Sequence, residues 1–312
     1  MPEGAIVDKK YRITKQLVVA GMSTVYLAHR LRTRTLVILK ASVPGGEAIL
    51  SEAMNNESNL LDQKIHPAFA KLHGVGRHAD GQYQAMEIIP GVTIQKVMEN
   101  EKCGKGTISV EMAVDWIIQV CDQLAALHQH EEAGAQKDLP GWLPGWVHRD
   151  IKDSNIMVTK EGRARVIDFG LACPVGHQET DNKVQGTPNY MSPDQIRNKP
   201  LDGRVDIYSL GLVLYTILTG RNPKTAMELG AVLNKQLHEA LPPIKPDDIK
   251  HRITGVWRWI KVRIPYFGKK FLHQLCTRIN GTINGMTAKE RDERMSIPQA
   301  LGELEAIKEL VS

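Results

Sequence analysis

Cysteine is scarce in this sequence, with only four among 312 residues. Cys103, Cys121, Cys173 and Cys276 are scattered, and none forms the C-x-x-C pair that zinc sites and redox motifs use. Neither a disulfide framework nor a zinc site is therefore indicated. Sparse, unpaired cysteines fit a reducing compartment, so we expect a cytoplasmic protein.

Long apolar segments and long runs of like charge are also missing. The N-terminal stretch MPEGAIVDKKYRITK has no apolar core of the signal-peptide type, and the longest apolar stretch, IYSLGLVLYTIL, is too short to span a bilayer. Forty basic and 35 acidic residues give a formal charge of +5 that is spread along the chain. We therefore expect no membrane span in this chain and no nucleic-acid partner.

Apolar residues make up 42% of the chain, enough to bury one large or two medium cores. Residues 11 to 40 alternate as strands do, and two further strand-like runs end at YQAMEII. Residues 47 to 62 have the apolar period of a helix that ends before His66-Pro67. After Pro90-Gly91 the pattern becomes helical, which predicts a lobe boundary near residues 87 to 91.

Three helices are expected in the second part of the chain. Ser109 can cap a helix that runs to about His128. The stretch RVDIYSLGLVLYTILTG is apolar on nearly all sides and ends at Gly220, which is typical of a helix buried in a core. The last helix starts with a capping box from Ser296 to Gln299. Its apolar face is formed by Leu301, Leu304, Ile307 and Leu310.

A β-hairpin is predicted where NIMVT and RARVID flank Glu161-Gly162, a two-residue turn signal. If Lys160 pairs with Arg163, the register places Asn155 opposite Asp168. Two oxygen ligands at one end of a ribbon suit a hard cation such as Mg²⁺.

Asp150 lies five residues before Asn155, close enough to work beside that ion. The alternative is that Asn155 and Asp168 only cap strand ends, where such residues are common. Their spacing relative to Asp150, Lys152 and Phe169-Gly170 favours the metal site.

Three motifs occur in a fixed order: HRDIKDSN at 148–155, DFG at 168–170 and GTPNYMSPD at 186–194. In these motifs the sequence resembles the eukaryotic-type (Hanks-type) Ser/Thr protein kinases, and its pattern is similar to that of bacterial members. The resemblance extends from about Tyr11 to Leu310. It implies an α+β, bilobal protein kinase fold, with residues 1–312 as a single kinase domain. Residues 1–87 would form a small β-rich N-lobe with one main helix, and residues 88–312 a larger, mostly helical C-lobe.

The resemblance implies a transferase that moves the γ-phosphoryl group of ATP to a serine or threonine of a protein substrate, with Mg²⁺ as cofactor. Autophosphorylation is compatible with this activity. Asp150 would accept the proton of the substrate hydroxyl, and Asn155 and Asp168 would hold Mg²⁺. Lys152 would neutralise the transferring phosphoryl group; the alternative for Lys152 is a solvated lysine.

An ATP pocket is implied as well. Lys40 ends the run VILK and matches the kinase lysine, and Glu57 lies on an apolar helix stripe where an unpaired carboxylate would be costly. Lys40 is therefore the expected partner of Glu57, with Glu52 as the alternative carboxylate. Other residues would surround the adenine, although such an apolar stripe can also be plain core. These are Met86 as gatekeeper, the Glu87 carbonyl, the Ile89 amide, and Val25, Ile38 and Met157.

The sequence departs from the family pattern at several places. The glycine positions of the phosphate loop hold Val18, Ala20 and Ser23, so Gly21 is the one glycine left to bring backbone amides near the β-phosphate. Ile38 replaces an alanine, and A-P-E has become Ser192-Pro193-Asp194. Residues 129–146 are longer than the family needs; they would form a surface loop docking Trp142 and Trp146, or an inert insertion.

Regulation is expected in the segment from Leu171 to Asp194. Arg149 would pair with a phosphate there, with Thr180 as the preferred acceptor. Thr187 would instead make a structural contact with Asp150 and Lys152.

Two further carboxylates are expected to have structural roles. Asp206 would brace the catalytic loop, and Asp194 would pair with Arg294.

Three functions are compatible with these motifs: an active Ser/Thr kinase, a pseudokinase that acts as a nucleotide- or protein-binding module, and a small-molecule kinase of the same fold. The missing glycines motivate the second function. Every charged catalytic residue is present, which favours the enzyme. The segment GTPNYMSPD, which in protein kinases shapes the groove for a peptide, argues against the third function.

Overall fold

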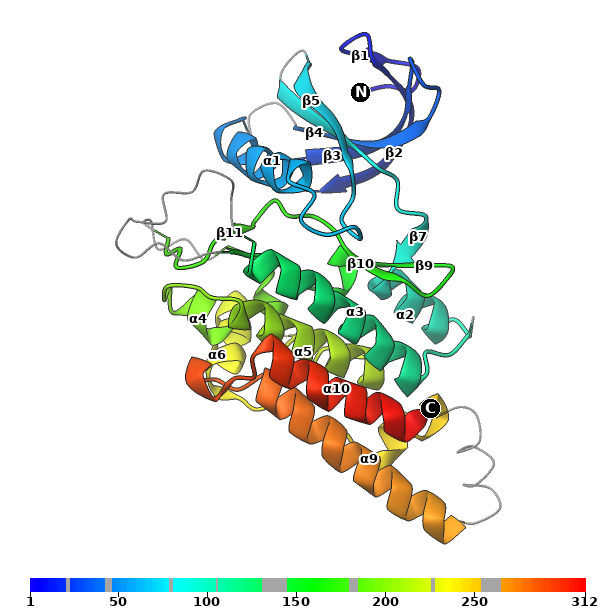
Figure 1. Cartoon of the computed structure of the whole chain (residues 1–312), viewed down its shortest axis with the longest axis vertical. Helices are drawn as coiled ribbons and strands as arrows, with labels where there is room; N and C mark the ends of the chain where they lie inside the picture. The colour runs from blue at the N-terminus through cyan, green and yellow to red at the C-terminus, as the bar shows by residue number, and fades with distance from the viewer. Residues whose placement is uncertain are drawn as a thin grey trace. The chain divides into compact units, whose positions relative to one another are not determined.

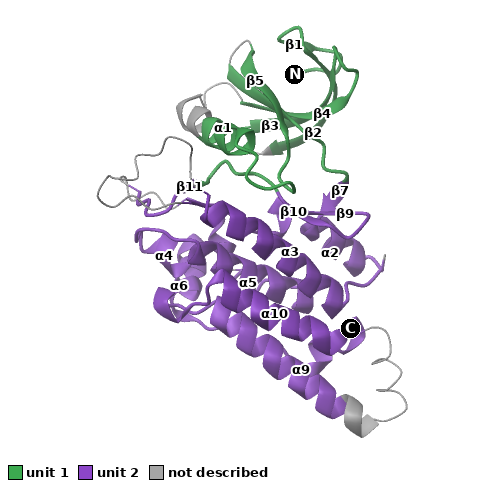
Figure 2. Cartoon of the chain, viewed as in Figure 1, with its two compact units in different colours: residues 1–90, 167–172 green, residues 91–166, 173–312 purple. Residues whose placement is uncertain are grey.

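A computed structural model describes residues 1–20, 23–42, 47–78, 81–104, 106–130, 145–179, 185–225, 228–253 and 265–312. The chain has two compact units (Figure 2). Unit 1 contains Met1–Pro90 and Ile167–Ala172, and unit 2 contains Gly91–Val166 and Cys173–Ser312. The short segment 167–172, which carries the DFG motif, therefore belongs with the N-terminal unit although it lies far along the sequence.

Unit 1 is built on a six-stranded antiparallel sheet in the order β1-β2-β3-β4-β6-β5 (Figure 1). The expected strand-like runs are confirmed. The strands are β1 (Ile6–Val7), β2 (Tyr11–Ala20), β3 (Ser23–Arg30), β4 (Leu36–Ser42), β5 (Leu72–His78) and β6 (Gly81–Met86). Because side chains alternate along a strand, one face collects a buried cluster. That cluster is formed by Val7, Tyr11, Ile13, Tyr26, Ala28, Val37, Leu39, Ala41, Tyr83 and Ala85.

The main helix of unit 1 is α1 (Glu47–Asp62), with the bounds that the sequence predicts. Met54, Leu60 and Leu61 are buried, so its apolar stripe packs inward. The helix also places the carboxylate of Glu57 inside the unit, where its side chain is only 2% exposed.

Unit 2 is mostly helical, with two small sheets. Its strands are β7 (Gly91–Thr93), β8 (Trp146–Val147), β9 (Ile156–Thr159), β10 (Ala164–Val166) and β11 (Cys173–Pro174), which form the orders β10-β9-β7 and β11-β8. Its α-helices are α2 (Ile94–Lys102), α3 (Val110–His128), α4 (Pro193–Ile196), α5 (Arg204–Thr219), α6 (Leu229–His238), α7 (Pro246–Ile249), α9 (Pro265–Met286) and α10 (Ile297–Val311). The described residues of unit 2 also form four 3₁₀ turns: η1 (Asp153–Asn155), η2 (Pro188–Tyr190), η3 (Lys250–Arg252) and η4 (Arg291–Glu293).

Helix α5 is the centre of unit 2 and packs against α3 and α9, while α10 covers α3 and α9 (Figure 1). Helix α5 is buried along nearly its whole length. It ends at Gly220, whose φ of 73° is the left-handed conformation that is typical of a helix C-terminus. The Ser109 hydroxyl accepts a hydrogen bond from the Met112 N–H and so caps α3. Ser296 and Gln299 form the capping box of α10. All three predicted helices are thus confirmed; on α10, Leu304 and Ile307 are buried, whereas Leu301 and Leu310 are half-buried.

The predicted register of the β9–β10 hairpin is wrong by one residue. Ala164 pairs with Val158 and Val166 with Ile156, so the ladder does not follow from a Lys160–Arg163 pair. The Thr159 N–H donates to the Arg163 carbonyl, which leaves a three-residue loop rather than two residues. Gly162 ends that loop with φ of 76°, and a left-handed glycine there is typical of three-residue hairpins. Asn155 therefore is not in register with Asp168.

No helix within the described ranges is long and apolar enough to cross a membrane.

Candidate active site

In unit 1, Lys40 lies between two carboxylates. Its Nζ donates to Glu57 Oε2 at 2.8 Å and to Asp168 Oδ1 at 2.7 Å. The predicted Lys40–Glu57 pair is confirmed, and Glu52 is not needed as the alternative. Burial by itself would lower the pKa of Lys40, but Glu57 and Asp168 outweigh burial and raise that pKa above its ordinary value. The ammonium group therefore stays charged across the neutral range.

Glu57 also joins the helix to the DFG segment. Its Oε1 accepts the Phe169 N–H at 3.2 Å, and its Oε2 accepts a hydrogen bond from Gln84 Nε2. The Phe169 ring is buried and packs edge-on against Phe69, with ring centroids 4.6 Å apart. Lys40, Glu57 and Phe69 thus contact the segment that carries Asp168 and hold it in place.

Gln84 is a member of this network that sequence reasoning missed. It pairs directly with Lys40 in the β4–β6 register, and its Oε1 accepts the Ser58 hydroxyl at 2.8 Å. No sequence signal identified this role, because the strand reads GQYQAM and carries a second glutamine; only the fold shows that the Gln84 amide is fully buried and needs hydrogen-bond partners.

Asp168 has a backbone conformation that non-glycine residues rarely adopt, with φ of 67°. Such strain persists only where surrounding contacts fix it, and it is concentrated at functional sites. The Asp168 side chain is 45% exposed, so one oxygen contacts Lys40 while the carboxylate stays open to solvent.

The expected adenine-pocket residues of unit 1 lie on one face of the sheet. Val25 pairs with Lys40 and with Val18, and Ile38 pairs with Met86. Since directly paired residues share a face, this places them with Lys40 and opposite the buried cluster. Val18 is 53% exposed, and Gly21 lies outside the described residues.

The predicted hinge residues follow β6. The Glu87 N–H donates to the Lys71 carbonyl at 2.8 Å, and the Glu87 carboxylate accepts the Lys71 N–H at 3.0 Å. Ile89 is buried. Met157, the remaining predicted pocket residue, is half-buried on β9 of unit 2, where it pairs with Thr93 and Arg165.

In unit 2, the carboxylate of Asp150 accepts hydrogen bonds from three side chains and one backbone amide. Lys152 Nζ lies at 2.7 Å and Asn155 Nδ2 at 2.9 Å from Oδ2. The Thr187 hydroxyl lies at 2.7 Å and the Thr187 N–H at 3.1 Å from Oδ1. Lys152 also donates to the Thr187 hydroxyl at 2.7 Å, which confirms the expected structural contact of Thr187.

As predicted, Asp206 stabilises the loop that carries Asp150. Its oxygens accept the His148 N–H at 2.8 Å and the Arg149 N–H at 2.9 Å, and His128 Nε2 lies 2.8 Å away. Complete burial would raise the pKa of Asp206, but the hydrogen bond with His128 and the charge of nearby histidines outweigh it and lower that pKa. His128, at the end of α3, gave no sequence signal for this contact.

Arg149 already has an acidic partner. Its Nη1 lies 2.6 Å from Glu179 Oε1, and its Nη2 contacts Gln185 Oε1 at 3.4 Å. Asn198 holds the backbone of Glu179 through two hydrogen bonds, of 3.0 and 2.9 Å. Sequence reasoning missed Glu179, and its predicted phosphate acceptor, Thr180, lies outside the described residues.

The predicted Asp194–Arg294 ion pair is confirmed, at 2.7 Å in the unit 2 core. Next to it, Ser192 and Gln195 form a capping box that starts α4. The side chain of Gln195 also donates to the Arg149 carbonyl at 2.9 Å. The spacing of Ser192 and Gln195 is a capping-box signature that could have identified this contact.

Each unit contains an oxygen donor whose chemistry fits a hard divalent cation. Asn155 uses its amide nitrogen twice, toward the carbonyl and the carboxylate of Asp150, and this orients its oxygen away from them. Among the described residues no group donates to that oxygen. In unit 1, the partly exposed carboxylate of Asp168 is likewise an oxygen donor of the kind that Mg²⁺ prefers. The described residues contain no cluster of three or more His, Cys, Asp or Glu side chains arranged for a metal, so such an ion would need further oxygens from water or phosphate.

Comparison with known proteins agrees with this geometry. The sequence model of the family described as the protein kinase domain matches residues 11–303. Serine/threonine-protein kinase PknB of Mycolicibacterium smegmatis is 31% identical over 248 residues, which are 76% of this chain and 36% of that protein. A probable serine/threonine-protein kinase of Clostridium acetobutylicum is 29% identical over 245 residues, which are 77% of this chain and 34% of that protein. PknB of Mycobacterium tuberculosis is 30% identical over 248 residues, 76% of this chain and 36% of that protein. The matched region is thus about a third of these relatives.

Proposed function

Because this chain belongs to the protein kinase family, we propose that it is an active serine/threonine protein kinase that uses ATP and Mg²⁺. The observation that carries the proposal is the Asp150 network. Asp150, Lys152, Asn155 and Thr187 are joined by hydrogen bonds of 2.7 to 2.9 Å. Positioning is the main task of a phosphoryl-transfer enzyme, and these contacts supply it.

Asp150 would orient the substrate hydroxyl and accept its proton. An ionised carboxylate has about four lone-pair sites, and four donors already contact this one. The Thr187 hydroxyl can rotate away at little cost, so an incoming serine or threonine hydroxyl would take its place. Lys152, which contacts both Asp150 and Thr187, would then face the transferred group and stabilise its negative charge.

Lys40 would bind phosphate oxygens of ATP, with Glu57 keeping its ammonium group in place. Asn155 and Asp168 would hold Mg²⁺, which supplies charge neutralisation at the phosphates when bound. The sheet face with Val18, Val25, Ile38 and Met86 would cover the base. Every charged group of the site is present and partnered, which favours the enzyme over a binding module without activity.

We further propose that units 1 and 2 are the two lobes of one kinase domain, and that its partner is a protein with a serine or threonine acceptor. Autophosphorylation would use the same site. A cytoplasmic location is part of the proposal and is supported by the four free cysteines, three of them buried.

The first prediction tests the catalytic assignment with Asp150→Asn and Asp168→Asn. Both changes keep the shape of the side chain and remove its charge, so we expect turnover to fall by about 10² to 10⁴-fold with little loss of stability. A γ-phosphate transfer assay with a generic basic protein measures this. Asp292→Asn is the matched control, because its side chain is 99% exposed. Near wild-type turnover in either site variant would show that the assignment is wrong.

A further inference from the structure

Unit 1 contains a cavity of about 260 Å³ that the proposed kinase reaction does not use. It is lined by Lys9, Lys10, Tyr11, Arg30, Arg32, His73, Gly74, Val75 and Tyr83. Tyr11 and Tyr83 belong to the buried cluster, so the cavity opens on the opposite face of the sheet from Lys40. It is therefore separate from the nucleotide-facing residues of the same unit.

The lining combines four basic side chains, two lysines and two arginines, with no carboxylate. Lys10 is paired with Asp8 at 2.7 Å, and Asp8 also accepts the Tyr83 hydroxyl at 2.7 Å. Among the described residues, no carboxylate pairs with Lys9, Arg30 or Arg32. The charges of Arg30 and Arg32 repel one another, and a bound anion would relieve that repulsion.

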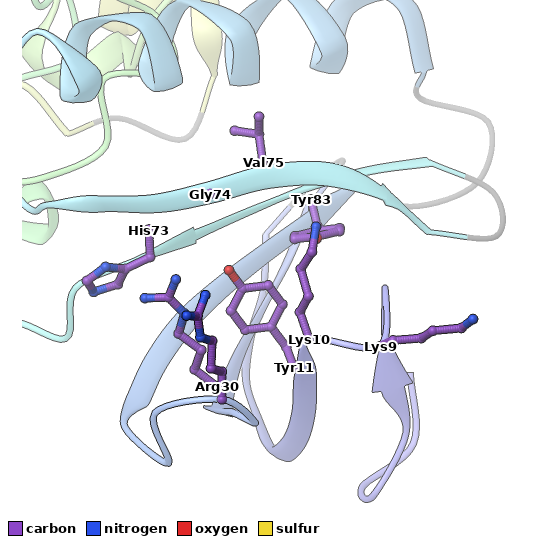
Figure 3. A pocket seen from close by; sticks show the side chains of 9 residues that line it. Lys9, Lys10, Tyr11, Arg30, His73, Gly74, Val75 and Tyr83 are labelled. Carbon is purple, nitrogen blue, oxygen red and sulfur yellow. The ribbon is translucent and has the colours of Figure 1, made fainter.

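Polar side chains from different strands line this cavity. Figure 3 shows the Tyr11 hydroxyl and the Arg30 side chain directed toward the strand that carries His73 and Gly74. The β5–β6 register shifts between Leu72 and Gly74, so His73 occupies a bulge, a device that re-aims a side chain. Burial, and then the charge of Arg30, lowers the pKa of His73, which places the two side chains in one electrostatic environment.

Glycine at position 74 leaves room for the Tyr11 hydroxyl beside the cavity. A Cβ atom there would meet the Tyr11 hydroxyl at 3.3 Å, closer than most such contacts. The other acid near the cavity is Glu87, which acts electrostatically on His73 while its carboxylate accepts the Lys71 N–H. Asp8 and Glu87 thus lie at the margins and leave the centre cationic.

We propose that this cavity is a binding site for a compact phosphate-bearing anion in solution, held by Arg30 and Arg32 with His73 and the Tyr11 hydroxyl. Arginine forks match the oxygens of a phosphoryl group, and a tyrosine hydroxyl adds a directed hydrogen bond. The volume lies just below the range of about 300 to 1,000 Å³ of pockets for drug-sized ligands. One or two phosphoryl groups therefore suit the cavity better than a whole nucleotide.

The second prediction tests this site by calorimetric titration of the whole chain with inorganic pyrophosphate at low salt. We expect Arg30→Gln and Arg32→Gln each to weaken pyrophosphate binding at least tenfold while kinase turnover stays unchanged. Arg12→Gln is the matched control, since Arg12 is an exposed arginine of the same sheet that does not line the cavity. Lys40→Met removes any contribution of the nucleotide site and should change this affinity less than twofold.

Three outcomes would overturn the proposal. An equal loss in Arg12→Gln would mean that diffuse charge, not the cavity, attracts the anion. Loss in Lys40→Met with retention in Arg30→Gln would place pyrophosphate in the nucleotide site. Arginine-dependent binding to phosphatidylglycerol vesicles without binding of pyrophosphate would assign the cations to a membrane surface.

Discussion

At the scale of single residues, Arg149 is the informative case. It is only 8% exposed, has a left-handed backbone with φ of 66°, and pairs with Glu179. Burial would raise the pKa of Glu179, but the hydrogen bond from Arg149 and the proximity of His177 outweigh it and lower that pKa, so the carboxylate is charged at neutral pH. Glu179 thus gives Arg149 the negative charge that the sequence led us to expect from a phosphate on Thr180.

The third prediction concerns this pair. In Glu179→Gln, Arg149 loses its carboxylate partner, and an uncompensated charge at a mostly buried position is unfavourable. We expect the turnover of phosphatase-treated protein to fall about tenfold, which corresponds to about 1.4 kcal/mol. Phosphorylation within Leu171–Asp194 should restore it, because the new anion can pair with Arg149.

Glu290→Gln is the control for that experiment, since it removes an exposed carboxylate that pairs with Arg197 in the same unit. Steady-state kinetics before and after phosphatase treatment, with mass spectrometry of the segment, measures the effect. Equal turnover of the treated variant and the treated wild type would show that Glu179 does not position Arg149.

Charged site residues were predictable because each belongs to a short motif in a fixed order. Lys40, Asp150 and Asp206 could be assigned in this way. Gln84 and Glu179 could not, because their roles depend on which side chains the folded chain brings to them. A glutamine or glutamate has no sequence pattern that states its partner.

At the scale of elements, the β2–β3 hairpin is where the chain departs most from a glycine-rich phosphate loop. Ala20 pairs with Ser23, so both strands run to the ends of the loop, and Val18 and Val19 are exposed at 53% and 62%. Side chains at these positions restrict how closely the backbone can approach a phosphate.

The fourth prediction is that Val18→Gly combined with Ala20→Gly lowers the apparent KM for ATP. Two or three additional backbone contacts with the phosphates, of about 0.5 to 1.5 kcal/mol each, should lower the apparent KM for ATP on the order of tenfold or more. Turnover at saturating ATP should change little. Val19→Gly is the matched control, because Val19 pairs with Thr24 and points to the other face. An unchanged KM in the double variant would mean that this hairpin does not contact the phosphates.

The helices whose ends carry a capping residue or a C-terminal glycine were predicted correctly. Ser109, Gly220 and the Ser296–Gln299 box mark helix ends through specific backbone hydrogen bonds. The Glu161-Gly162 turn was off by one residue, because a single glycine is compatible with both two-residue and three-residue hairpin loops. Whether the loop has two or three residues depends on its backbone conformation, which these residue types do not determine.

At the scale of the whole molecule, stability should depend on pH through a lysine cluster in unit 2. Lys289 Nζ donates to the Tyr208 hydroxyl and to the Gln236 carbonyl. Burial, followed by the charges of Lys224 and Arg294, lowers the pKa of Lys289 from 10.5 to about 7. Burial also lowers the pKa of Lys224.

The fifth prediction follows from the sign of that shift. Between pH 7 and 10.5 the unfolded chain binds a proton at Lys289 that the folded chain has released, so this group makes the free energy of unfolding rise with pH. The slope is at most about 1.4 kcal/mol per pH unit for one proton. Lys289→Met should remove this slope, whereas Lys270→Met, at an exposed lysine of α9, should keep it. Urea unfolding at several pH values measures it, and identical slopes in all three proteins would contradict the prediction.

The packing of α10 on α3 sets an order of events during synthesis. Asp115 of α3 forms an ion pair with Lys308 of α10, a residue 193 positions later. A ribosome adding about 5 to 20 residues per second needs roughly 10 to 40 s to make that stretch. The face of α3 that α10 covers therefore stays exposed for most of the time in which unit 2 is made, and α3 completes its packing only after the last helix has been synthesised.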